Sequence, residues 1–271
     1  MKKTDIYMLQ KPVSYLPTII LLLCLSCSSR TAAVENTEAK DAITRSVKLY
    51  SSENWEIRKM AISRVVVYSG TAYSRNVILL LLKATDDPHP LVRVEALHAL
   101  TRIKTESAHG RIREMALYDR ETVVRWSAYK ALEVYGSADD ESAFITGYSD
   151  SDWLIREAAI RGLLVIDDDA VQARNVQLVI SAINDSSISV RIDALYHVRF
   201  KDAGLYREIT ALINNKKTGV SLLKAALTAV SGYRLDENTR NRIVKLLTHE
   251  NRDVRVLSLR ALKKDEELKK M

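Results

Sequence analysis

Hydrophobic residues recur along this chain in a block that returns every 31 to 35 residues. In six copies an aliphatic residue precedes an arginine, a small residue follows the arginine by three positions, and apolar residues follow by four and seven. The six pairs are Ile57-Arg58, Val92-Arg93, Val124-Arg125, Ile155-Arg156, Val190-Arg191 and Val254-Arg255. A seventh copy, Leu222–Leu227, keeps the apolar positions without the arginine. This spacing predicts an α-helix with one apolar face in each copy.

A second amphipathic stretch lies upstream of these helices, as in Arg111–Tyr118 and Val176–Ile183. Short joins such as Asp86–Pro90 combine a helix stop with N-cap residues for the next helix. Each repeat is therefore predicted to be a helical hairpin. Because one hairpin cannot bury its apolar face alone, we expect about seven of them to stack into an all-α solenoid over residues 40–263. Residues 264–271 are predicted to be a polar C-terminal end.

Four copies also carry an aspartate six residues before the arginine. With these two columns the sequence resembles the HEAT repeat, in particular the short bacterial form called PBS-lyase HEAT-like. The resemblance implies an armadillo-type fold, a right-handed α-α superhelix, in which the two columns form a hydrogen-bonded ladder between successive repeats. The ladder residues that it implies are Asp87, Asp119, Asp150 and Asp185, with Arg58, Arg93, Arg125, Arg156, Arg191 and Arg255.

Three copies depart from this pattern. Ser52 and His249 replace the aspartate in the first and last copies, and Lys217 and Leu223 replace both partners in the sixth. Terminal repeats are commonly atypical, but the sixth copy is internal. We therefore expect the ladder to be interrupted there, with repeats six and seven docked less rigidly on the first five.

The first 26 residues resemble a secretory signal, because lysines precede an apolar stretch that ends in small residues. Leu25-Ser26-Cys27 resembles the bacterial lipobox, whose cysteine receives a diacylglycerol, although Cys24 stands where the usual pattern has leucine. The expectation is cleavage before Cys27, lipidation of Cys27 and a flexible tether over residues 27–39. Ordinary signal cleavage and an uncleaved anchor are the alternatives.

Composition supports an exported globular protein. Of 271 residues 47% are hydrophobic, with 8 Gly, 4 Pro and 2 Cys, which excludes disordered and disulfide-rich classes. Both cysteines lie in the signal region, so the body suits an oxidising bacterial cell envelope. If Cys27 is lipidated, Ser28 after it favours the periplasmic face of an outer membrane, with the cell surface as the alternative. Signal removal takes three lysines and one aspartate, and lowers the net charge from +7 to +5.

The chain offers no candidate catalytic residues, cofactor or metal site. Phosphate loops and nucleophile motifs are missing, and the histidines do not fall at ligand spacing. One HEAT-repeat enzyme, deoxyhypusine hydroxylase, uses several His-Glu pairs as iron ligands, whereas only His249-Glu250 occurs in this chain. Asp167–Asp169 is interpreted as a helix-capping turn rather than a calcium site. The mild charge disfavours nucleic acid as a partner.

The remaining candidates lie on the second helix of each hairpin, which is expected to line a concave face. The column five after the arginine is polar, basic and aromatic, and Trp126 stands one residue after its arginine. Such residues dominate binding hot spots, although Trp126 could instead pack between repeats three and four. The candidate partner-binding residues are His98, Trp126, Lys130, Arg161, Tyr196 and Arg260.

These features predict a non-enzymatic, lipid-anchored scaffold or adaptor that binds a partner protein and no small-molecule substrate. Two alternatives stay open: an accessory subunit of an envelope enzyme complex, and a protein that links the membrane to the cell wall. The second needs a cationic patch for an anionic polymer, which Lys130, Arg161 and Arg260 would supply only in part.

Overall fold

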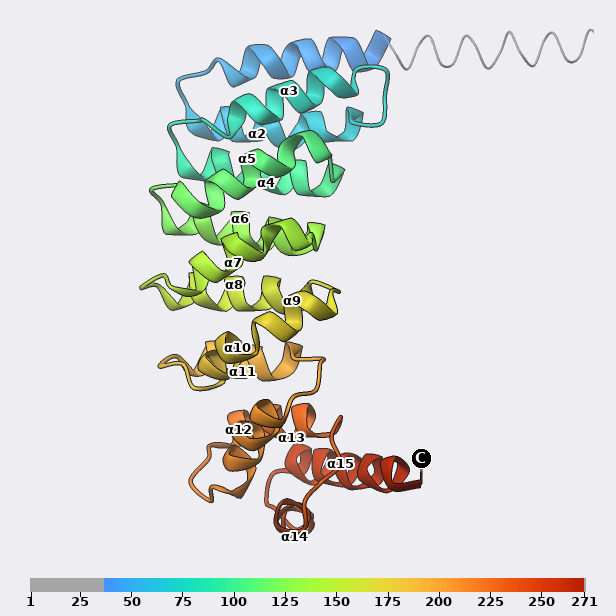
Figure 1. Ribbon diagram of the computed structural model, residues 1–271. Coiled ribbons are helices and arrows are strands. Elements are labelled where there is room, and N and C mark those ends of the chain that lie inside the picture. Colours follow the sequence, from blue (N-terminus) through green and yellow to red (C-terminus); the bar gives the residue numbers. More distant parts are fainter. Residues whose placement is uncertain (1–36, 271) are drawn as a thin grey trace, which may run out of the picture.

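The computed structural model describes residues 37–270, which form a single stack of helical hairpins (Figure 1). Residues 37–50 are helical and precede α2. The labelled helices are α2 (Trp55–Val65), α3 (Ser74–Ala84), α4 (Pro90–Ile103), α5 (Glu106–Tyr118), α6 (Thr122–Tyr135), α7 (Glu141–Tyr148), α8 (Trp153–Val165), α9 (Asp169–Arg174), α10 (Val176–Ile183), α11 (Ile188–His197), α12 (Ala203–Asn214), α13 (Val220–Val230), α14 (Glu237–Leu246) and α15 (Arg252–Lys270). No strand occurs in this part of the chain. The predicted fold class, an all-α helical solenoid, is confirmed.

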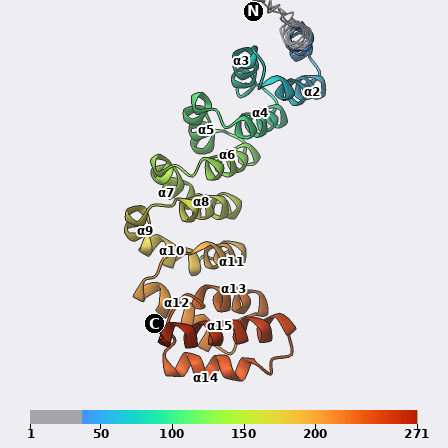
Figure 2. The ribbon, with the colours of Figure 1, turned by 90° about the vertical axis from the view of Figure 1, so that its right-hand side faces the viewer.

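The stack has two layers and is bowed. Figure 2 shows α2, α4, α6, α8, α11 and α13 on the inner side of the curve, and α3, α5, α7, α10 and α12 on the outer side. The repeating arginine block therefore forms the inner layer, and the amphipathic stretches upstream of it form the outer layer. We call the solvent-exposed side of α4, α6, α8, α11 and α13 the inner face.

The core runs along the whole stack between the two layers. The small column, Ala61, Ala96, Ala128, Ala159, Ala194, Ala226 and Ser258, is completely buried. The large residue that follows each of them is buried as well, except Leu259 in the last copy, which is 61% exposed. No further hairpin within the described residues covers α15, so the position that is internal elsewhere faces solvent there.

The ends of the repeat domain differ from the expected boundaries. The first helix includes residues 37–39, which were expected to belong to the tether. Helix α15 continues to Lys270, through the segment expected to be a polar end. Asp265 in that segment is fully buried, where it pairs with Arg240 at 2.5 Å and accepts the Leu235 N–H at 2.9 Å. The segment is therefore an integral part of the last hairpin.

The predicted signal segment and Cys27 lie outside the described residues. Within residues 37–270, none of the helices combines the length and the apolar character needed to cross a bilayer.

Two glycines allow helices of the fourth repeat to approach aromatic rings. A Cβ on Gly162 of α8 would lie 2.1 Å from a ring carbon of Phe144, and one on Gly147 of α7 would lie 2.4 Å from the ring of Tyr129. Both rings are fully buried and cannot move aside without opening the core. The absence of a side chain at these two positions is what lets α6, α7 and α8 pack at this distance.

The variant Gly162→Ala is expected to lower the free energy of unfolding by about 1 to 3 kcal/mol, because the added methyl overpacks the core against Phe144. Gly110→Ala is the matched control. Gly110 lies inside α5 with nothing within 4 Å of an added Cβ, so the exchange should stabilise the helix by about 0.5 to 1 kcal/mol. Urea denaturation of both variants measures the difference, and a Gly162→Ala protein as stable as the parent would contradict a tight contact between α8 and Phe144.

Candidate functional site

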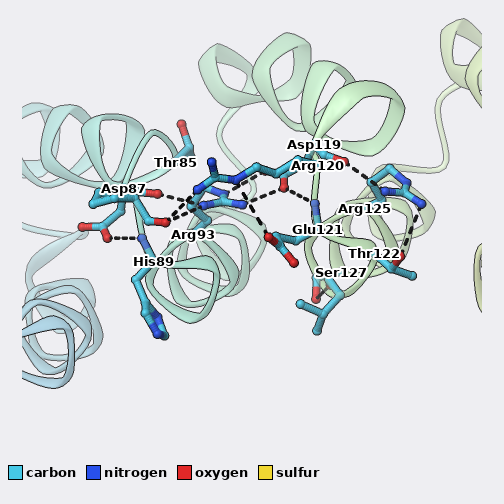
Figure 3. Close-up of polar contacts among 12 residues, drawn as sticks. Thr85, Asp87, His89, Arg93, Asp119, Arg120, Glu121, Thr122, Arg125 and Ser127 are labelled. Carbon is cyan, nitrogen blue, oxygen red and sulfur yellow. Dashed lines mark hydrogen bonds and ion pairs between the residues drawn. The ribbon is translucent and has the colours of Figure 1, made fainter.

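An ion-pair ladder connects successive hairpins at the turns that lead into the inner helices (Figure 3). Arg93 donates from Nε and Nη2 to the two carboxylate oxygens of Asp119, at 2.8 and 2.7 Å. Arg58 binds Asp87 in the same way at 2.7 and 2.8 Å, and Arg156 binds Asp185 at 2.9 Å through both nitrogens. Each of these arginines thus holds the aspartate of the next repeat with a bidentate contact, the strongest geometry for this pair.

Every rung also fixes the backbone of the turns that it joins. Asp87 accepts the N–H of His89 at 2.9 Å, while Arg93 donates from Nη1 to the Asp87 carbonyl at 2.9 Å. Burial alone would raise the pKa of Asp87, but hydrogen bonds from Arg58, the His89 N–H and Tyr50 outweigh it and hold this pKa below the ordinary value. The aspartate is therefore ionised at neutral pH and serves both the turn and the neighbouring repeat.

The third rung is weaker than the others. Arg125 reaches Asp150 through one contact of 3.3 Å. Its Nη2 also lies 3.4 Å from the Thr122 hydroxyl, a contact drawn in Figure 3. The side chains of Arg125 and Asp150 are 19% and 22% exposed, against 6% and 9% for Arg93 and Asp119. Solvent and looser geometry both reduce what this pair contributes.

The ladder stops at Arg191. Its Nε donates to the Ile183 carbonyl at 2.9 Å, and no carboxylate pairs with it within the described residues, since Lys217 stands at the aspartate position of the next repeat. Arg255 in the last hairpin donates to the carbonyls of His249 and Glu250, both at 2.8 Å.

The end repeats keep the turn function of the aspartate without its charge. Ser52 Oγ accepts the Asn54 N–H at 3.2 Å, and His249 Nδ1 accepts the Asn251 N–H at 3.0 Å.

On the inner face, His98 and Lys130 line a groove of about 480 Å³ between α4 and α6. Arg102 and Lys104 also contribute to its lining, and Val134 supplies part of an apolar floor. Neither aspartate nor glutamate lines this groove, so its local charge is positive. Lys104 ends α4 in the left-handed conformation with φ 51°.

Lys130 and Arg161, which the column pattern presented as free basic residues, are paired in the structure. Arg161 donates to Asp193 at 2.9 and 2.5 Å and to Glu157 at 2.8 Å, and Lys130 pairs with Glu133. Burial, and then the charge of Asp193, raise the pKa of Glu157. The basic residues at the centre of the inner face are therefore largely neutralised by acidic neighbours that the column pattern does not reveal.

A strip of exposed apolar side chains follows the beginnings of the inner helices. Leu91, Val123, Trp126, Leu154 and Ile188 are each between 36% and 52% exposed. Trp126 is thus neither fully buried between repeats nor fully open. Because the strip crosses four hairpins, it is an extended surface rather than a set of scattered residues.

The other two candidate partner-binding residues and the other two tryptophans lie outside the apolar strip and the groove between α4 and α6. Tyr196 and Arg260 are exposed on α11 and α15. Trp55, three residues before Arg58, stacks on the imidazole of His89 with ring centres 4.0 Å apart. Trp153 has the same phase but is 43% exposed.

Two further groups bear on chemistry. Asp168, in the acidic triplet, caps α9 by accepting the N–H groups of Ala170 and Val171 at 2.8 and 2.9 Å. Within residues 37–270 no group of three or more His, Cys, Asp or Glu side chains is placed to hold a metal ion.

Comparisons with known proteins agree with this architecture. Residues 46–133 match the family described as HEAT repeats. The X-ray structure of Escherichia coli YibA is similar with a TM-score of 0.61 and 13% identity, covering 96% of this chain and 99% of that one. An engineered protein is similar with a TM-score of 0.54 and 18% identity, covering 83% and 68%. These likenesses show the fold, a helical repeat solenoid.

A more distant likeness involves an enzyme. The structure of human deoxyhypusine hydroxylase in complex with glycerol gives a TM-score of 0.42 and 14% identity, covering 88% of this chain and 99% of that one. No curated protein sequence matches the chain.

Arg93→Leu is expected to lower the free energy of unfolding by about 3 to 5 kcal/mol, because it leaves Asp119, whose side chain is only 9% exposed, without a counter-charge. Arg125→Leu should cost only about 1 kcal/mol, because its partner is solvated and the contact is long. Chemical denaturation of the two variants side by side measures the contrast. Equal losses would mean that the rungs of Arg93 and Arg125 do not differ in strength.

Proposed function

We propose that this protein is a non-enzymatic scaffold or adaptor that holds a partner protein along its inner face. The observation that carries the proposal is the apolar strip on this face, which also carries the basic groove between α4 and α6. Large apolar side chains exposed in a row, with Trp126 among them, have the composition of an interface anchor.

Rigidity of the inner helices supports the same use. The bidentate rungs fix the turns that position α4, α6 and α11, so the strip is organised before a partner arrives. A surface that loses little conformational freedom on association binds at lower entropic cost. Fold alone does not define a function, and solenoids of this kind are also compatible with other roles.

Two other roles are weaker candidates. A link to the cell wall would need free cations to meet an anionic polymer, but Lys130 and Arg161 already pair with three carboxylates. Binding of nucleic acid would likewise need free cations on the inner face. An accessory role in an envelope enzyme complex differs from a scaffold only in the nature of the partner.

We further propose that Cys27 carries a lipid that anchors the protein in a bacterial envelope membrane, with the periplasmic face of the outer membrane as the first choice. This proposal rests on the lipobox-like sequence before Cys27 and on the lack of other cysteines in the body of the chain.

A photo-crosslinking residue at position 98 in the native cell should capture a discrete protein. His98 lines the basic groove and has no side-chain hydrogen bond among the described residues, so its replacement disturbs little. The matched control is position 79, because Leu79 is exposed on the outer helix α3 of the same hairpin. Mass spectrometry of the adducts identifies the partner, and equal capture from both positions would argue against the inner face.

Cys27→Ala should move the protein from the membrane fraction to the soluble fraction, since nothing described in the body of the chain spans a bilayer. Cell fractionation followed by immunoblotting measures the shift, with Cys24→Ala as the control. A Cys27→Ala protein that stays in the membrane would rule out a lipid on Cys27 as the anchor.

A further inference from the structure

The break in the ladder leaves an arginine without the partner that its counterparts have. Arg58, Arg93, Arg125 and Arg156 each bind a carboxylate of the following repeat. Arg191 occupies the same column, but its only hydrogen bond among the described residues runs from Nε to the Ile183 carbonyl. Its two Nη nitrogens, which together fit the two oxygens of one carboxylate, make no hydrogen bond in this part of the chain.

Arg191 lines an open groove of about 460 Å³ between α11 and the turn into α13. Apolar side chains form much of its walls, namely Ile188, Leu212, Val220 and Leu222. Ile188 and Val220 are 52% and 37% exposed, and Ile188 is also the last member of the apolar strip. The groove is therefore continuous with the inner face.

The electrostatics of the groove select the charge of an occupant. Lys217 lies in the lining together with Arg191, and no acidic residue does. Lys216 and Lys217 are exposed, and neither side chain forms an ion pair within residues 37–270. A single negative group would gain from the two cations of the lining, Arg191 and Lys217, and would face no repulsion from an acidic lining residue.

We propose that this groove binds an acidic side chain, Asp or Glu, flanked by apolar residues in a segment of a partner protein, and that this carboxylate completes the interrupted rung in trans. The apolar walls favour such a peptide over a hydrated phosphate, because they offer contacts to the flanking apolar side chains. The inference rests on the proposed protein-binding role and names the chemistry of the partner.

The test uses the purified full chain and two capped seven-residue peptides that differ in one atom group. One peptide carries a single glutamate between leucines, and in the other a glutamine replaces the glutamate. The glutamate peptide should bind about tenfold more tightly, the effect of one charge-assisted hydrogen bond. Its addition should also shift the side-chain NMR signal of Arg191. Equal binding of the two peptides, or no binding at millimolar concentration, would overturn the proposal.

Variants of the chain separate the rung from general charge. Lys217→Asp puts a carboxylate at the ladder position. It should therefore raise the midpoint of thermal unfolding and weaken binding of the glutamate peptide at least about tenfold. Lys216→Asp makes the same charge change one residue away, at a position outside the lining of the groove, and should weaken binding only about threefold because solvent screens the added charge. Identical effects of the two variants would mean that net charge alone attracts the peptide.

Two further measurements test the geometry of the rung and the chemistry of the ligand. Arg191→Lys keeps the charge but removes the planar fork, so it should reduce the preference for glutamate over glutamine to about threefold while the circular dichroism spectrum is retained. Inorganic phosphate should compete poorly, and effective competition would assign the groove to phosphate groups instead. The peptide assay reads the groove directly, whereas the crosslink at position 98 reads the inner face in the cell, so either can fail without the other.

Discussion

The relative position of successive hairpins depends on one interaction, the bidentate ion pair between an arginine and the aspartate of the next hairpin. Apolar burial makes the hairpins stack, but burial is non-directional and would tolerate rotation or sliding of one hairpin against the next. A planar guanidinium with two hydrogen bonds to one carboxylate and a third to a turn carbonyl removes that freedom, as seen for Arg93. Because the same aspartate also closes the turn at the start of the next inner helix, a single pair sets both the local backbone and the relative position of two repeats.

The inner face combines two surfaces with different energetics. At its centre, Arg161 lies between Glu157 and Asp193, so much of the charge there is satisfied internally and offers little to a ligand. At the beginnings of the inner helices, the large side chains of the apolar strip remain exposed, next to the turns that the ladder fixes. Binding energy on this face would therefore come mainly from apolar contact, with the groove at His98 and the break at Arg191 contributing charge selectivity.

Much of the fold could be predicted from the sequence, because the repeat shows the same physical requirement seven times. The small column is readable from spacing, since it repeats with the hairpin, whereas the pairing of Arg93 with Asp119 was expected from the resemblance to HEAT repeats. The acidic partners of the inner face were not found because they do not form a column. Glu157 lies four residues before Arg161, a spacing that pairs side chains on a helix, and could have been recognised. Asp193 belongs to another repeat, so its contact with Arg161 could be found only once the distance between α8 and α11 was known. The strength of each rung could not be predicted either, because Arg125 and Arg93 occupy the same position in the repeat but differ in burial.

The unequal rungs have a mechanical consequence. Stiffness in a stack of hairpins is limited by its weakest joints. In this stack they lie where Arg125 makes one long contact, and beyond Arg191, which has no carboxylate partner within residues 37–270 and is followed by Leu223 in the arginine column. Bending strain applied along the bow in Figure 2 would concentrate at these joints, while the segments between them move as rigid bodies. The curvature of the solenoid can thus adapt at a few discrete places, without remodelling the surface of any single hairpin.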